Sequence, residues 1–129
     1  MAKNTHAPIM NAQVSIVSHG DAPPVLKSRF TFDCTRLRDP EGQPQLKSLD
    51  GDHMLVRLWV SADPRVKLMS DMCLLYVNDM LRETPSKNFI TFAFRDKKGK
   101  WIAPAVAEVV ATALEQKGLR VHVAHEQLS

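Results

Sequence analysis

The stretch from Ile90 to Val123 constrains the fold of this chain more than any other. It opens with Ile90-Thr91-Phe92-Ala93-Phe94, a run of β-branched and aromatic residues typical of a buried strand. A basic loop follows, then an apolar helical pattern over 104–117 that ends at a glycine, then a second strand pattern over 119–123. A strand, a helix and a second strand in this order predict a βαβ unit, in which both strands run parallel in one sheet.

The loop inside that unit is the place where a ligand is expected. Free N–H groups at the helix start and the helix dipole both favour an anion after the first strand. Residues 95–100 read Arg-Asp-Lys-Lys-Gly-Lys and carry four cations. A β-hairpin is the alternative, with Gly99 in the turn and Lys100-Trp101-Ile102 as the second arm. Pro104 and the helical stripe after it favour the strand-to-helix loop, but the local pattern leaves both structures open.

The remaining pattern predicts a single α/β domain with a mixed or mostly parallel sheet of about four strands and about three helices packed on it. Further strands are expected at 13–18 and 29–34, and further helices at 54–60 and 64–83. Asp63 and Pro64 form a helix start, because the carboxylate accepts from free N–H groups and proline suits the first helical position. We expect residues 1–12 to form a flexible N-terminal segment before the domain at 13–129.

The helix predicted at 64–83 is expected to bury one face. Its apolar residues recur at steps of three and four, and they are Val66, Met69, Met72, Cys73, Tyr76, Val77, Met80 and Leu81. Methionines at this spacing would also suit a cofactor or partner surface. Core packing is the prediction, because methionine commonly fills gaps in cores.

Composition narrows the classes of protein. The chain has 129 residues, 44% of them hydrophobic, which is enough for one cored domain. A net charge of +3 suits a phosphate-bearing partner but is far from a nucleic-acid-binding stripe. Cys34 and Cys73 lack metal-site spacing and are expected to be reduced and buried, and no metal or cofactor is predicted. Without an apolar run long enough for a membrane span or a signal peptide, the chain is expected in the cytoplasm.

Several short motifs, in matching order, carry a resemblance to a known family. Val14-Ser15-Ile16-Val17-Ser18-His19-Gly20 is similar to the opening strand and S-F-G of the C-terminal domain of RapZ, the bacterial RNase adapter protein. Phe32-Asp33-Cys34-Thr35-Arg36-Leu37-Arg38-Asp39-Pro40 resembles that family's F-D-V-R-x-L-R-N-P, and Leu46-Lys47-Ser48-Leu49-Asp50-Gly51 resembles its L-R-P-L-T-G. The last helix, the last strand and His125 also follow the family's order, so the resemblance runs from about Val14 to Leu128.

The chain departs from the family in the ligand loop. The family pattern G-C-T-G-G-x-H-R-S falls on residues 95–103, where only Gly99 is retained and Lys100 supplies a cation. Larger side chains at the other glycine positions are expected to stop the main chain from wrapping a phosphate. Thr35 replaces the arginine of the first motif, with Arg36 beside it, and the terminal H-R-D has lost its carboxylate.

The resemblance implies a domain that senses an amino-sugar phosphate and binds small RNA within a nuclease adapter. Because the ligand loop of this chain is altered, we expect a non-catalytic binding or adapter domain, whose partner is RNA or a bacterial regulatory or nuclease protein. Trp101 offers either a stacking face for a base or a packing side chain. The candidate ligand-binding residues are Asp33, Arg36, Arg38, Lys47, Arg95, Lys97, Lys98, Gly99, Lys100, Trp101 and His125.

Two further hypotheses remain open at this point. A sensor or enzyme for a phosphorylated small molecule, such as an amino-sugar phosphate or nucleotide, would use Asp33 or His125 as acid or base. The sequence, however, indicates no Ser–His–Asp or Cys–His nucleophile set. A short chain without a G-x-x-x-x-G-K-[ST] motif would also suit a phage or bacterial decoy that inhibits a host regulator. A homo-oligomer is also among the possible assemblies.

Overall fold

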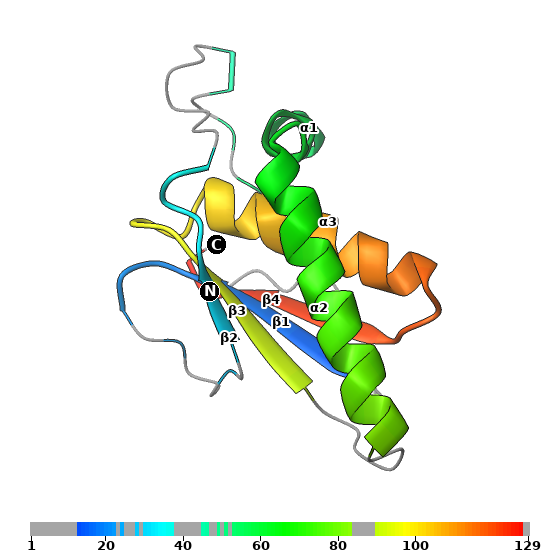
Figure 1. Ribbon diagram of the computed structural model, residues 1–129. Helices are drawn as coiled ribbons and strands as arrows, with labels where there is room; N and C mark the ends of the chain where they lie inside the picture. The colour runs from blue at the N-terminus through cyan, green and yellow to red at the C-terminus, as the bar shows by residue number, and fades with distance from the viewer. Residues whose placement is uncertain are drawn as a thin grey trace.

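The computed structural model describes residues 13–22, 24, 28, 30–37, 45–46, 49, 51, 53–83 and 90–127. Within these residues the chain forms one small α/β domain with four strands and three helices, as expected (Figure 1). In chain order they are β1 (Val14–His19), β2 (Phe30–Asp33), α1 (Met54–Ser61), α2 (Pro64–Glu83), β3 (Ile90–Arg95), α3 (Ile102–Gln116) and β4 (Val121–His125). The segment 1–12 and the candidate residues Arg38 and Lys47 lie outside the described residues.

The four described strands form one sheet in the order β2-β3-β1-β4, and every neighbouring pair is parallel. Val14 is in register with Ile90 on one side and with Val121 on the other, so β1 separates β3 from β4. Helix α3 therefore crosses over β1, as the parallel βαβ unit requires. All six residues of β1 are buried, which matches its central place.

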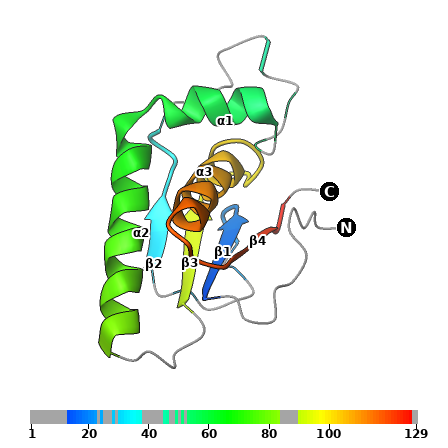
Figure 2. The same ribbon diagram turned by 90° about the vertical axis from the view of Figure 1, so that its right-hand side faces the viewer.

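Helix α3 packs directly on the sheet, against β1, β3 and β4. Helices α1 and α2 pack on α3, and they meet at a corner beside it (Figure 2). Asp63 begins α2 as predicted, because its Oδ1 accepts from the N–H of Arg65 at 3.0 Å. Buried side chains from the sheet and helices form the core, including Ile16, Phe92, Phe94, Val106, Val110, Leu114 and Val123.

The favoured strand-to-helix loop is confirmed and the alternative hairpin does not form, because residues 97–100 are a bend that leads into α3. Three sequence predictions need correction. Helix α3 begins at Ile102, two residues before the predicted start at Pro104. The last strand begins at Val121 rather than Leu119 and extends to His125. The prediction that Met72 lies in the core is wrong, because the residue is 50% exposed. Helix α2 leans on α3, which buries Cys73 and Val77 and leaves the Met72 side open.

Candidate functional site

The candidate site lies at the carboxyl edge of the sheet, where parallel strands all end together. His19, the last residue of β1, is in register with Arg95 at the end of β3, and Asp33 at the end of β2 is also in register with Arg95. The loop from Asp96 to Trp101 leaves from this edge and leads into α3. In open α/β sheets this edge is the usual position for ligands.

The Asp96 carboxylate occupies the amide groups of the loop. One of its oxygens accepts from the N–H of Gly99, and the other accepts from the N–H of Ala103 in the first turn of α3 at 2.8 Å. Asp96 itself is 6% exposed, and its own N–H donates to the His19 carbonyl at 3.2 Å. N–H groups that would otherwise attract an anion at a helix start are therefore already bound to a carboxylate of the same chain.

The glycines of the site hold the loop close against β1. Gly99 has φ +69°, and a Cβ at this position would lie 2.7 Å from the amide nitrogen of Gly20 and 2.8 Å from the carbonyl carbon of His19. A Cβ at Gly20 would lie 3.0 Å from the carbonyl oxygen of Lys97. On the other side, the N–H of Gly51 donates to the carbonyl of Lys100 at 2.6 Å. The glycines thus serve tight packing between two backbones, which leaves little space for a phosphate between loop and strand.

Arg95 is matched by two carboxylates. Its Nη2 lies 2.8 Å from Oδ1 of Asp21, and its Nη1 lies 3.4 Å from Oδ1 of Asp33. The pKa of the Asp33 carboxyl lies below its ordinary value, mainly because the N–H and the hydroxyl of Thr35 both donate to Oδ1, at 3.0 and 2.8 Å. The nearby Arg95 lowers this pKa further. Asp33 therefore stays ionised near neutral pH, and a general-acid role does not suit it.

The loop lysines differ from Arg95 in being exposed. Within the part of the chain that the structure describes, Lys97 and Lys100 have no carboxylate within ion-pair distance. Lys98 places its Nζ 5.5 Å from the ring centroid of Trp101, in the range of a cation–π contact. Trp101 is partly buried and packs against the core. The positive charge that remains available to a partner is thus on long side chains at the loop surface.

A buried polar chain lies behind the loop. The hydroxyl oxygen of Ser18 lies 2.7 Å from Nδ1 of His125, and Nε2 of His125 lies 2.6 Å from a carboxylate oxygen of Glu108. The other Glu108 oxygen is 3.7 Å from the Arg57 guanidinium. Ser18 and His125 are 0% exposed, and Glu108 is 3% exposed. These hydrogen-bonded side chains connect β1, β4, α3 and α1. Because Ser18 is fully buried, a substrate cannot reach its hydroxyl.

Comparison with known proteins identifies the family. A profile of the RapZ C-terminal domain matches residues 12–129. This chain belongs to the RapZ C-terminal domain family. It is 32% identical over 103 residues to a nucleotide-binding protein of Roseobacter denitrificans, covering 77% of this chain and 34% of that protein. It is 27% identical over 124 residues to a nucleotide-binding protein of a Jannaschia species, covering 95% and 39%.

A third relative, a nucleotide-binding protein of Rhodospirillum rubrum, is 31% identical over 101 residues, which is 77% of this chain and 32% of that protein. The chain thus spans about a third of the length of the relatives it matches. Against the RapZ loop pattern, Asp96 falls on the cysteine position and Ala103 on the serine position. Asp96, which stands in place of the family's cysteine, is the residue whose carboxylate accepts from the amides of Gly99 and Ala103.

The structure brings some of the predicted site residues of this RapZ-family domain together at the carboxyl edge and places others elsewhere. At the carboxyl edge it brings together Asp33 with Arg95, Gly99 with the Asp96 carboxylate, and Lys98 with Trp101. Arg36 is exposed just after β2, and its carbonyl accepts from Arg65. His125 is fully buried, so we no longer count it among the residues that contact a ligand.

Sequence reasoning missed Asp96 and the buried polar chain. Glu108 is one residue from which the buried hydrogen-bonded group could have been predicted. It is a carboxylate within the otherwise apolar stretch 102–111, where an unpaired charge would be costly to bury. The described residues contain no group of three metal-ligating side chains. No helix in the described part of the chain is long and apolar enough to cross a membrane.

Proposed function

We propose that this domain binds RNA without catalysing a reaction, and that the exposed lysines of the β3–α3 loop hold the phosphates. The proposal rests on which cations at the carboxyl edge are paired with carboxylates and which are not. Arg95 is matched by Asp21 and Asp33, whereas Lys97 and Lys100 face solvent with no such partner among the described residues. Lysines on a surface loop are suited to phosphate contacts, which position a nucleic acid without reading its sequence.

The occupied amides favour RNA over a small phosphorylated ligand. A sugar phosphate held by the main chain would have to displace the buried Asp96 carboxylate from Gly99 and Ala103. It would also need space where Gly99 and Gly20 pack together. RNA phosphates need only the lysine side chains, which extend from the outer surface of the loop. The relatives are named nucleotide-binding proteins, which agrees with a partner that carries phosphate.

Trp101 is assigned to packing rather than to base stacking. Its ring is partly buried and carries the Lys98 ammonium at 5.5 Å, so a base would have to compete with both contacts. Arg36, exposed at the same edge of the sheet, is the next cation available to the RNA. A site made of flexible cations with no free aromatic face binds structured RNA with little sequence preference.

A non-enzymatic role agrees with the geometry of the polar groups. The Ser18–His125–Glu108 chain is the nearest approach to a nucleophile set within the described residues, and its serine is 0% exposed. Asp33 is held ionised by Thr35 and Arg95, so it has no proton to donate near neutral pH. We assign both groups to holding the strands and helices around the loop in position.

Filter binding of a structured RNA hairpin at a low and a high salt concentration tests the proposal. The loop variant replaces Lys97, Lys98 and Lys100 with glutamine, and a matched control replaces Arg82, Lys117 and Arg120, which have the same total charge. Arg82 lies in the last turn of α2, and Lys117 and Arg120 lie between α3 and β4, away from the carboxyl edge.

The wild type is expected to lose affinity with a log–log salt slope of about −2.7, from roughly three phosphates with the factor for a double helix. The loop variant should bind at least about tenfold more weakly at low salt and should lose most of that slope. The control variant should bind as the wild type does. Equal loss in both variants, or no binding by the wild type at either salt concentration, would contradict the proposal.

A further inference from the structure

A pocket of about 540 Å³ lies between helix α2 and the edge strand β2. Helix α2 packs on α1 and α3, and the space that remains between it and β2 forms the pocket. No residue of the β3–α3 loop lines this pocket, so it is separate from the lysines that we assign to RNA. Its volume lies within the range of roughly 300–1,000 Å³ that is typical of sites for small organic molecules.

Aromatic rings form the sheet side of the pocket. Phe30 stacks on Phe92, with ring centroids 6.2 Å apart and an angle of 10° between the rings. Phe32 stacks in the same way on Phe94, at 5.1 Å and 13°. From the helix side, the Tyr76 ring meets Phe30 edge to face at 4.8 Å. Phe30 nevertheless remains 44% exposed, so part of its ring surface is open to a further planar group.

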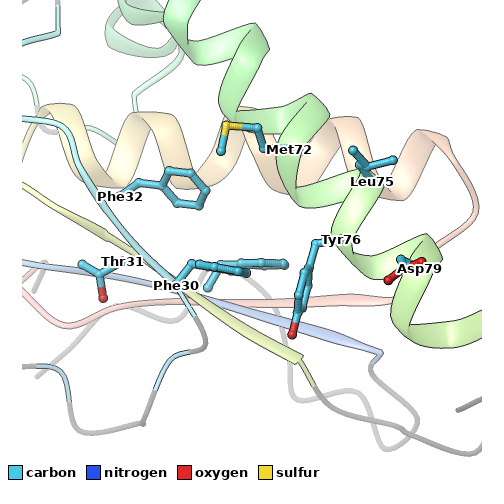
Figure 3. Close-up of a pocket in the computed structure, with 8 residues that line it drawn as sticks. Phe30, Thr31, Phe32, Met72, Leu75, Tyr76 and Asp79 are labelled. Atoms are coloured by element: carbon cyan, nitrogen blue, oxygen red, sulfur yellow. The ribbon is translucent and has the colours of Figure 1, made fainter. Parts of the chain in front are cut away.

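Aliphatic side chains of α2 complete the wall on the helix side. Figure 3 shows Met72 directed toward Phe32, with Leu75 further along the same helix. Met72 is 50% exposed and Leu75 is 72% exposed. A bound apolar molecule would remove these side chains and Phe30 from water, which is favourable in proportion to the apolar area covered. The walls therefore select a ligand with an apolar body.

A single carboxylate gives the pocket its charge. Among the described residues that line it, Asp79 alone is charged, and Figure 3 shows Asp79 and Phe32 at opposite ends of the group. Oδ1 of Asp79 lies 3.1 Å from Nη2 of Arg82, and the two side chains are 54% and 77% exposed. Such an exposed pair contributes little free energy, so a cation in the pocket can share the carboxylate with Arg82. The lining therefore favours a positively charged ligand.

We propose that this pocket binds a small organic cation with a planar aromatic body. The ring of the ligand lies against Phe30, and its ammonium group pairs with Asp79. Stacking on an aromatic ring and pairing with a carboxylate are the two contacts that recognise such a molecule. A neutral molecule of the same shape loses only the ion pair, whereas an anion meets a like charge at Asp79. The affinity should therefore fall in the order cation, neutral molecule, anion.

NMR titration of the full chain with naphthylmethylamine tests the proposal, with naphthylmethanol and naphthoate as the neutral and anionic probes. The amine is expected to shift the amides of Phe30, Phe32 and Tyr76, with a Kd of about 1 mM or lower. The alcohol should bind about fivefold more weakly than the amine, and naphthoate more weakly still. Equal affinity for the three probes would indicate a general apolar contact, such as a side chain of a partner protein, and overturns the proposal. The absence of shifts at these residues with any probe also overturns it.

A pair of aspartate variants tests the charge. Asp79→Asn should reduce the affinity for the amine about fivefold and should leave the affinity for the alcohol unchanged. Asp71→Asn is the matched control, because Asp71 also lies on α2, is 57% exposed and pairs with Lys67 at 2.9 Å, but does not line the pocket. This control should bind the amine as the wild type does. An equal effect of the two variants on amine binding overturns the assignment of Asp79.

A pair of tryptophan variants tests the position of the ligand. Met72→Trp should weaken amine binding at least about tenfold, because the indole occupies the space beside Phe32. Leu68→Trp should bind as the wild type does, because Leu68 is 58% exposed on α2 but does not line the pocket. Equal binding by the two variants overturns the proposed position. The Kd of the wild type should also be the same at about 50 and 500 µM protein. A Kd that rises with protein concentration would show that another copy fills the pocket, and it overturns the assignment to a small molecule.

Discussion

Replacing Asp96 with alanine tests whether the carboxylate holds the loop. The change removes two hydrogen bonds, from the N–H of Gly99 and from the N–H of Ala103, at a position that is 6% exposed. A hydrogen bond to a charged group contributes about 1.5–3 kcal/mol, so the free energy of unfolding should fall by about 3–6 kcal/mol. Domains of this size are stable by roughly 5–15 kcal/mol, and urea unfolding measures the loss directly.

The same variant should acquire an anion site that the wild type lacks. With the carboxylate gone, the amides of Gly99 and Ala103 and the volume that the carboxylate filled at the start of α3 become available to inorganic phosphate, without any change in the packing of Gly99 against Gly20. At ten times its Kd, phosphate stabilises a protein that binds it by about 1.4 kcal/mol. At roughly 4 °C per kcal/mol, Tm should rise by about 6 °C in Asp96→Ala. The wild type should show only the smaller general effect of the salt.

Asp96→Asn provides the matched control for this experiment. Asparagine keeps the size of the side chain and one acceptor oxygen, but it sets an NH₂ group against the second N–H donor. The variant should lose about 2–3 kcal/mol of unfolding free energy and should gain nothing specific from phosphate, because its side chain fills the position. Stability of Asp96→Ala within about 1 kcal/mol of the wild type, or equal phosphate stabilisation of both, would refute the reasoning.

Other predictions concern the buried and ionised groups. Cys34 and Cys73, with pKa values of about 12, should resist a thiol reagent at pH 8 until the protein unfolds, and reaction of the folded protein would contradict their burial. Because the folded pKa of Asp33 is lowered, this carboxyl contributes stability above its unfolded pKa, and the contribution is lost as pH falls through its folded pKa. Thr35→Val removes the hydroxyl donor and should raise the folded pKa of Asp33, which an NMR titration measures. Ser18→Ala should reduce the unfolding free energy by about 1–3 kcal/mol in urea, and an unchanged midpoint would exclude a structural role for this hydroxyl.

The order of elements could be predicted from local patterns. The β-branched and aromatic run at 90–94, the Asp63-Pro64 helix start and the apolar stripe after Pro104 each matched one element type. The sheet order could not be predicted, because the position of β1 between β3 and β4 depends on contacts across the whole chain. The prediction for Met72 failed for a related reason: spacing shows which residues share a helix face, but the direction in which α2 leans decides which part of that face is covered.

The position of the candidate loop was predictable, but the contacts made by its amides were not. The topology of a βαβ unit places the 95–101 loop at the carboxyl edge, and the family pattern shows which glycines are gone. The contact of Asp96 with Ala103 spans seven residues and depends on where α3 begins, which the sequence placed two residues too late. The pairing of His125 with Glu108 depends on the register of β4 beside β1 and on the rotation of α3, and neither is set locally.

Amide NMR of the full chain during titration with a structured RNA tests the central claim most directly. The account predicts that shifts concentrate at Lys97, Lys98 and Lys100 and weaken steeply with salt. The amides of Gly99 and Ala103 should keep the positions set by the Asp96 carboxylate when a sugar phosphate is added instead. Large shifts of those two amides with the sugar phosphate, together with an unmoved lysine loop in RNA, would contradict the account.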